Sequence, residues 1–213
     1  MTRPPFPEVL DSSMLASFRS CPQKFFREYL EHWKPKSESV HLVAGKAFAA
    51  GLEALRLGYF VEALPLEDAL ARGCEALIKA YGDFECPPDS AKSLERMLGA
   101  LEYYTEAFPL NDEPAPPSIL AGGKRGIEFS FTEPIDLLHP ETGNPLLYCG
   151  RMDQIVDFAG ARYGEDDKTT GSLGASWPRQ WDLRSQFSAY CWGARQAGIP
   201  LQGFLVRGIA ILK

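Results

Sequence analysis

The chain has 213 residues, 45% of them hydrophobic and 12% aromatic, which is enough apolar material for one sizeable core. No apolar run is long enough to span a bilayer, and we expect neither a membrane anchor nor a signal peptide. Five scattered cysteines without a CxxC motif argue against a disulfide framework and a zinc ribbon, so a reducing cytoplasm fits best. The net charge of −6 excludes a protein that coats nucleic acid by bulk charge, but it allows an enzyme with one locally basic groove.

Residues 1–108 are predicted to form a helical part. Ser12 or Ser13 is expected to cap the first helix, and Pro22 suits the first turn of the second. Helical spacing of apolar residues then predicts further helices over 42–58, 66–82 and 91–108.

The pattern changes after a proline-rich stretch, "PLNDEPAPPS", which we expect to be a rigid polar connector over 109–118. Residues 119–213 are predicted to form a sheet core. Strands are expected over 126–133, 146–158, 161–170 and 203–213, with a helix over about 182–197 that Gly198 and Pro200 close. We therefore expect a single domain of α/β or α+β class, with a central mixed sheet flanked by helices.

The stretch "CGRMDQIVDFAGARYGEDDKTT" is typical of a β-hairpin with a two-residue turn. A turn at 159–160 places Asp153 directly opposite Asp166, whereas a turn at 160–161 places Asp153 opposite Lys168. In both registers Asp153, Asp166 and Lys168 share one face of the ribbon, because strand side chains alternate with a period of two.

Two neighbouring carboxylates repel each other unless a cation lies between them, and Mg²⁺ prefers oxygen ligands of this kind. A nearby lysine ammonium can orient the attacking water, so the set suits hydrolysis of a phosphodiester. The alternative is a solvated strand face with ordinary ion pairs. Against it, Asp153 lies within the apolar run "MDQIV", where an unused carboxylate is costly.

Gln186 and Tyr190 are four residues apart and are expected on one face of the following helix, beside an apolar stripe of Phe187, Cys191 and Ala194. An amide and a phenol on one face can contact a phosphate or a base. By spacing alone, the alternative that both lie at the rim of a packed helix is favoured.

The motifs "GRMDQIVDF", "YGEDDKTT" and "QFSAY" together resemble the successive motifs of the PD-(D/E)xK nuclease superfamily, in its RecB-like exonuclease branch of bacteria and phages. "SMLASFRSCPQKFFREYL" and "GKAFAAGLEAL" are similar to the N-terminal elements of that branch. The resemblance covers nearly the whole chain in order and implies a restriction-endonuclease-like core.

The resemblance implies that Asp153 and Asp166 bind Mg²⁺ or Mn²⁺, that Lys168 assists the water, and that Gln186 and Tyr190 contact DNA. Glu128 occupies a position at which relatives often carry a glutamate on the first strand.

The chain departs from the family at Ala49, where relatives usually carry a metal-binding histidine four residues after the equivalent of Gly45. Glu53 and His41 are the candidates for replacing that ligand. The cysteines that pair with Cys21 in relatives with an iron–sulfur centre are missing, so no cluster is predicted.

The sequence thus predicts a metal-dependent DNA exonuclease that serves recombination, repair or phage replication, in a bacterial cell or a phage-infected host, with a helicase or recombination protein as a partner. The alternative, favoured by Ala49, is a catalytically impaired module that binds DNA ends or a partner protein. The absence of a GxxxxGK[ST] motif argues against an ATPase that would use "EDD" as its Walker B acids.

Overall fold

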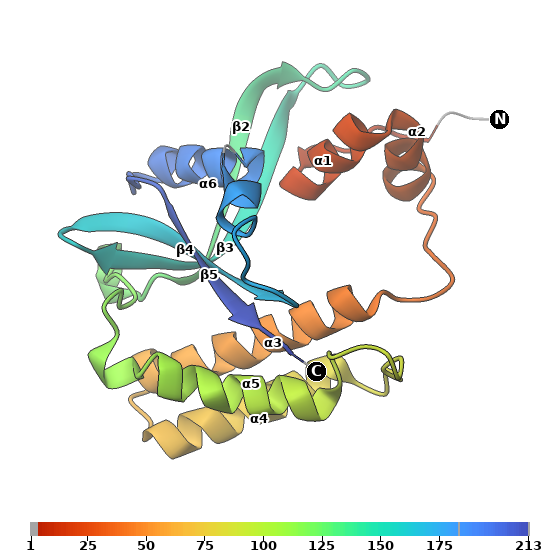
Figure 1. Ribbon diagram of the computed structural model, residues 1–213. Helices are drawn as coiled ribbons and strands as arrows, with labels where there is room; N and C mark the ends of the chain where they lie inside the picture. Colours follow the sequence, from red (N-terminus) through yellow and green to blue (C-terminus); the bar gives the residue numbers. More distant parts are fainter. Residues whose placement is uncertain (1–3, 183, 213) are drawn as a thin grey trace. The chain divides into compact units, whose positions relative to one another are not determined.

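The structure, a computed structural model, describes residues 4–182 and 184–212. Within them the chain forms a five-stranded mixed sheet and six α-helices (Figure 1), which confirms the mixed α/β class and the helical N-terminal part. The strand order is β1-β3-β4-β5, and β2 also pairs with β3. The β1–β3 and β4–β5 pairs are parallel, whereas β3 and β4 are antiparallel.

The longer strands lie close to where the sequence predicts them. β2, β3, β4 and β5 span Ile127–Leu138, Pro145–Phe158, Ala161–Thr170 and Phe204–Ala210. β1 (Val9–Leu10) was not expected, because two residues are too few to display an alternating pattern. Leu183 and Lys213, which the sequence places in the expected helix and the last strand, lie outside the described residues.

The chain divides into two compact units, each built from three separate segments. Unit 1 contains residues 4–37, 130–151 and 184–200, and unit 2 contains residues 38–129, 152–182 and 201–212. None of the helices in the described part of the chain is both long and apolar enough to cross a bilayer.

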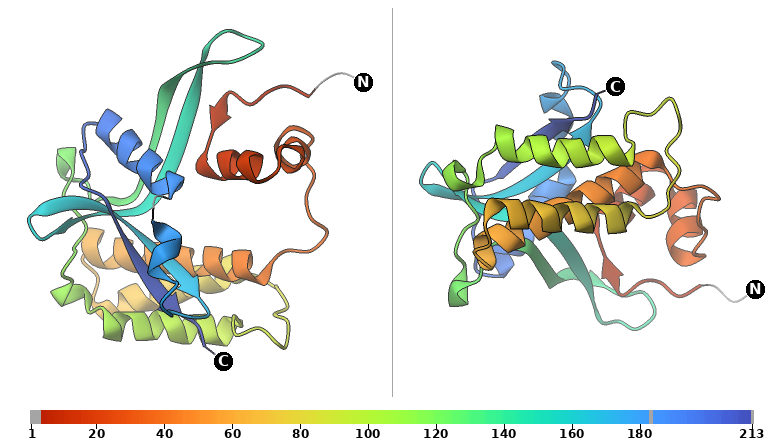
Figure 2. Two further views of the ribbon diagram at one scale, coloured as in Figure 1. Left: turned by 45° about the horizontal axis from the view of Figure 1, so that its top comes forward. Right: turned by 90° about the horizontal axis from the view of Figure 1, so that it is seen from below.

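In unit 2, three helices lie side by side next to β4 and β5 (Figure 2). They are α3, α4 and α5, over Val40–Arg56, Leu66–Tyr81 and Leu94–Ala107. Their apolar stripes form the core of the unit, with Phe48, Leu52 and Leu101 at its centre. α3 and α4 approach closely where Gly51 and Gly73 meet, since a Cβ on Gly73 would lie 2.9 Å from the carbonyl oxygen of Gly51.

The proline-rich connector also belongs to unit 2, and part of it is buried although its composition is polar. Ala115 is 3% exposed and Ser118 is fully buried. The backbone N–H of Ser118 donates to the carbonyl of Ile155 at 2.8 Å, and Pro117 forms an isolated bridge with Val156. The connector therefore packs as part of the sheet's border, because its apolar side chains and backbone groups find partners on β3.

Unit 1 contains α1 (Ser12–Ser20), α2 (Pro22–Phe25) and α6 (Ser185–Gln196), and α2 continues as a π-helical turn to Leu30. The expected cap at Ser12 or Ser13 is wrong. The N-cap of α1 is Asp11, whose carboxylate accepts a hydrogen bond from the backbone N–H of Met14 at 2.8 Å.

Candidate active site

The β3–β4 hairpin determines which side chains of the candidate site meet. Its tip is the turn Ala159–Gly160, in which both residues have positive φ, 48° and 78°, as a type I′ turn requires. Gln154 lies opposite Glu165, so the next pair along the ribbon brings Asp153 opposite Asp166. The first of the two registers left open by the sequence is therefore confirmed.

Asp166 and Lys168 interact directly, as their common strand face predicts, through an ion pair between Lys168 Nζ and Asp166 Oδ2. Asp153 joins them from β3, and its Oδ2 accepts a hydrogen bond from the backbone N–H of Asp167 at 3.0 Å. The Asp166 side chain is almost fully buried, whereas that of Lys168 is 33% exposed. The structure thus gathers the three predicted groups on one face of the ribbon.

The two carboxylates lie in an environment that disfavours their charge. Burial and the neighbouring Asp153 raise the pKa of Asp166 to about 6, although Lys168 opposes this. Burial also raises the pKa of Asp153, although the hydrogen bond from Asp167 and the charge of Lys168 work in the other direction. Asp166 Oδ2 is buried, and its partner among the described residues is the Lys168 ammonium. One lysine does not balance two buried carboxylates, so the pair fits a divalent cation.

Glu165 and Asp167 of β4 take part in a buried charge network with two arginines. Glu165 accepts a hydrogen bond from Gln154 Nε2 at 2.6 Å and from Arg207 Nη2 at 3.0 Å. Asp167 accepts one from Arg56 Nη2 at 2.5 Å. Burial, with Asp167 close by, raises the pKa of Glu165 to about 7. These acids are held by two arginines, but Asp167 also lines one cavity with Asp153 and Lys168, so its expected separation from the candidate site is incomplete.

A cavity of about 510 Å³ opens between α3 and the end of β4, and Asp153 and Lys168 both line it. Its lining combines charged, hydroxyl and apolar side chains of unit 2: His41, Gly45, Phe48, Ala49, Leu52, Lys92, Asp153, Asp167, Lys168, Thr169, Thr170 and Gly171. A volume of this size is typical of sites for small ligands or single nucleotides.

The position at which the resemblance expects a histidine lies at this cavity. Ala49 lines the cavity with only a methyl side chain. His41 lines the same cavity from the N-terminal end of α3. Neither Glu53 nor Glu128 is among the described residues that line it. Glu128 instead occupies a strained position of β2, with φ of 51°.

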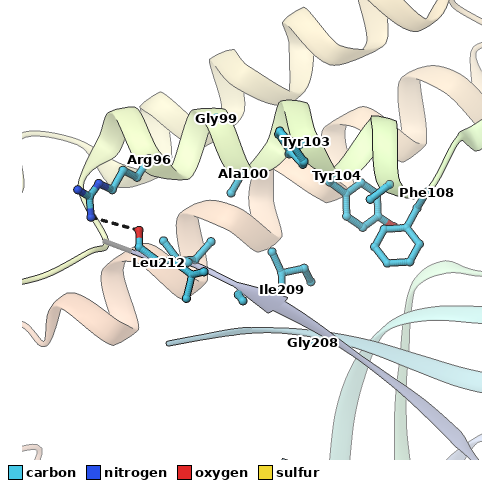
Figure 3. A pocket seen from close by; sticks show the side chains of 12 residues that line it. Arg96, Gly99, Ala100, Tyr103, Tyr104, Phe108, Gly208, Ile209 and Leu212 are labelled. Carbon is cyan, nitrogen blue, oxygen red and sulfur yellow. Dashed lines mark hydrogen bonds between the residues drawn. The ribbon is translucent and has the colours of Figure 1, made fainter. Parts of the chain in front are cut away.

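A second cavity of unit 2, of about 390 Å³, lies between α5 and β5 and is mainly apolar (Figure 3). Tyr104, Phe108 and Ile209 line it, and Arg96 at its end donates a hydrogen bond to the carbonyl of Leu212 at 3.2 Å. No carboxylate of the described residues lines this cavity, so it lacks the chemistry of the first.

Gln186 and Tyr190 belong to α6 in unit 1. Gln186 Nε2 donates to the Tyr190 hydroxyl at 3.0 Å, which confirms that both lie on one helical face. Tyr190 is only 7% exposed, and its ring meets Phe131 edge-on with centroids 6.1 Å apart. The buried residues of α6 are Phe187, Tyr190, Gly193 and Ala194, and Cys191 of the expected stripe is half-buried.

In residues 4–182 and 184–212, no three His, Cys, Asp or Glu side chains are grouped as a metal site. Asp153 and Asp166 are a pair, which falls below that number, and solvent completes the ligand shell of Mg²⁺ in many sites with few carboxylates. Comparison with protein-family models and with curated proteins finds no match to this chain.

Proposed function

We propose that this protein is a metal-dependent DNA nuclease, with exonuclease action on linear DNA. The observation that carries the proposal is the meeting of Asp153, Asp166 and Lys168 on one face of the β3–β4 ribbon, beside a cavity large enough for a nucleotide. Burial raises the pKa of both carboxylates, so keeping both of them charged is costly for the protein alone. A bound cation would offset this cost, which supports a cation-binding site.

Asp153 and Asp166 would hold the ion in this site. Mg²⁺ or Mn²⁺ supplies positive charge at the reacting phosphate and lowers the pKa of water when bound. Lys168 then holds the attacking water or stabilises charge that develops on the phosphate, because its ammonium is partly exposed toward the cavity. Gln186 and Tyr190 are proposed to contact the DNA, as the resemblance implies.

We place the activity in the cytoplasm, in recombination, repair or phage replication, with a helicase or recombination protein as a partner. A second candidate function is a catalytically impaired nuclease-fold module that binds DNA ends or a partner protein. The observation that favours it is the methyl group of Ala49, which lines the cavity where relatives usually place a metal ligand.

The proposal is tested by incubating wild-type protein with linear double-stranded and single-stranded DNA in Mg²⁺ or Mn²⁺. Lys168→Ala is expected to lower the cleavage rate by at least about 100-fold, as loss of a proton-transfer or charge-stabilising group does. Lys124→Ala, at an exposed lysine of the same unit, is the control and should cleave as wild type does.

Calorimetric titration with Mn²⁺ separates the two candidate functions. Wild type should bind Mn²⁺, and Asp153→Asn should lose most of this binding. If folded wild-type protein leaves the DNA intact with either ion, the proposed nuclease function is rejected. Tight binding of DNA without cleavage and without uptake of Mn²⁺ would establish the impaired module instead.

A further inference from the structure

Lys92 is a buried lysine beside the candidate active site that the proposed chemistry does not use. It lies in the segment before α5, is 6% exposed, and lines the same cavity as Asp153 and Lys168. Its Nζ donates a hydrogen bond to the hydroxyl of Thr169 at 3.1 Å. No carboxylate of the described residues forms an ion pair with it.

A buried ammonium without a carboxylate partner is unusual, because lysine is rarely buried unless it is paired. Burial lowers the pKa of Lys92, which reflects this unfavourable environment. The neighbouring cation of the cavity differs, since Lys168 is neutralised by Asp166. Asp167, which also lines the cavity, is bound to Arg56. Lys92 is therefore a buried cation of this cavity with which no carboxylate of the described residues forms an ion pair.

The position of Lys92 is fixed by its backbone. Its carbonyl accepts a hydrogen bond from the Tyr81 hydroxyl at 2.7 Å, and its N–H donates to Ser90 Oγ at 3.1 Å. Thr169 accepts a single hydrogen bond from the ammonium, which leaves two N–H groups to donate. A pre-positioned cation with free donors in a cavity of about 510 Å³ suits a phosphate oxygen.

We infer that Lys92 is a phosphate-binding residue of this cavity. It contacts one phosphodiester of the bound strand, the neighbour of the phosphodiester that lies at Asp153 and Asp166. The inference rests on the proposed function for its choice of ligand. It adds a residue from the segment before α5 to a site otherwise built from strands, and it assigns that residue to binding.

The test compares wild type, Lys92→Met, Lys92→Arg and the surface control Lys124→Met. Each protein is titrated with a fluorescein-labelled single-stranded oligodeoxynucleotide in EDTA, so that no cleavage competes, and binding is measured by fluorescence anisotropy over a range of salt concentrations. Thermal unfolding of each variant is recorded alongside. Lys92→Met should fold, since replacing a buried unpaired charge with an apolar side chain of similar length is tolerated.

Lys92→Met is expected to weaken binding by about 10-fold or more, as loss of a charge-assisted hydrogen bond does. The slope of log Kd against log salt should also fall by about 0.7, the value for one phosphate contact on a single strand. Lys92→Arg should restore the slope, and Lys124→Met should match wild type. A purely structural role for Lys92 would lower the melting temperature without changing this slope.

The inference is overturned if Lys92→Met binds with the wild-type Kd and salt slope, or if wild type does not bind the oligonucleotide. Its failure can be told apart from failure of the proposed function, because this assay needs no cleavage. Binding that depends on Lys92 in a protein that never cuts DNA would reject only the nuclease. If wild type cleaves DNA and Lys92→Met binds DNA as wild type does, only the inference about Lys92 is rejected.

Discussion

The carboxylate of Asp166 should lower the stability of the folded protein at neutral pH. Its pKa is about 6 in the folded protein, against an ordinary value of 3.8, because burial and Asp153 disfavour the charge. When the folded-state pKa exceeds the unfolded value, the free energy of unfolding falls as pH rises between the two values and then stays low. The difference corresponds to about 3 kcal/mol, at about 1.4 kcal/mol per pKa unit.

Asp166→Asn, which removes the charge but keeps the size, should therefore raise the free energy of unfolding by up to about 3 kcal/mol at about pH 8. At about pH 4 the two proteins should be nearly equally stable, because the wild-type carboxyl is protonated in the folded state. Urea unfolding followed by circular dichroism measures this difference at each pH.

Asp83→Asn, at an exposed aspartate, is the matched control and should show no such dependence on pH. Addition of Mg²⁺ should reduce the difference in free energy of unfolding between wild type and Asp166→Asn. An ion that binds only the native wild-type site stabilises only the wild-type protein. A lower stability of Asp166→Asn than of wild type at about pH 8 would show that the carboxylate is stabilised by its surroundings, contrary to our reasoning.

Three further changes test the packing of unit 2. Arg56→Met leaves buried carboxylates without their cation and should cost about 3–5 kcal/mol in urea unfolding, and a loss below about 1 kcal/mol would contradict the network. Gly73→Ala places a Cβ 2.9 Å from the carbonyl oxygen of Gly51 and should lower the free energy of unfolding by about 1–3 kcal/mol in thermal unfolding, whereas Gly99→Ala, with nothing within 4 Å, should not destabilise the protein. Ala159→Gly relieves a φ of 48° in the hairpin turn and should stabilise by about 0.5–1 kcal/mol, and unchanged urea midpoints would mean that the turn is not strained.

Local patterns predicted the larger elements of the fold, because helices and strands repeat their apolar residues with different, characteristic periods. The alternation of Ile127, Phe129 and Phe131 with polar residues predicted β2, and Gly160 indicated the turn between β3 and β4. The packing of the connector could not be predicted, because composition reports polarity and stiffness, but not whether a backbone group has a partner on a distant strand. Ser118 reaches the carbonyl of Ile155, a contact with no local signal.

The same distinction applies to the site. Asp166 and Lys168 are two residues apart on one strand, so their meeting follows from the strand period alone. Arg207 and Lys92 meet residues of β4 from other elements, and such contacts depend on how helices and strands pack. One signal for Arg56 was available, because a charged residue directly follows Leu55 in the apolar stripe of α3 and must be paired if it is buried there.

The burial of the connector has a consequence for dissecting the protein. Its Glu113 accepts hydrogen bonds from Arg207 at 3.2 and 3.3 Å, so the stretch between α5 and β2 is tied to the last strand. A protease given the native protein should spare this stretch, despite a composition that resembles a hinge. If the parts of the chain before and after the connector were expressed separately, one cooperative folding unit would be divided. Neither part should then be obtained as a stable fragment.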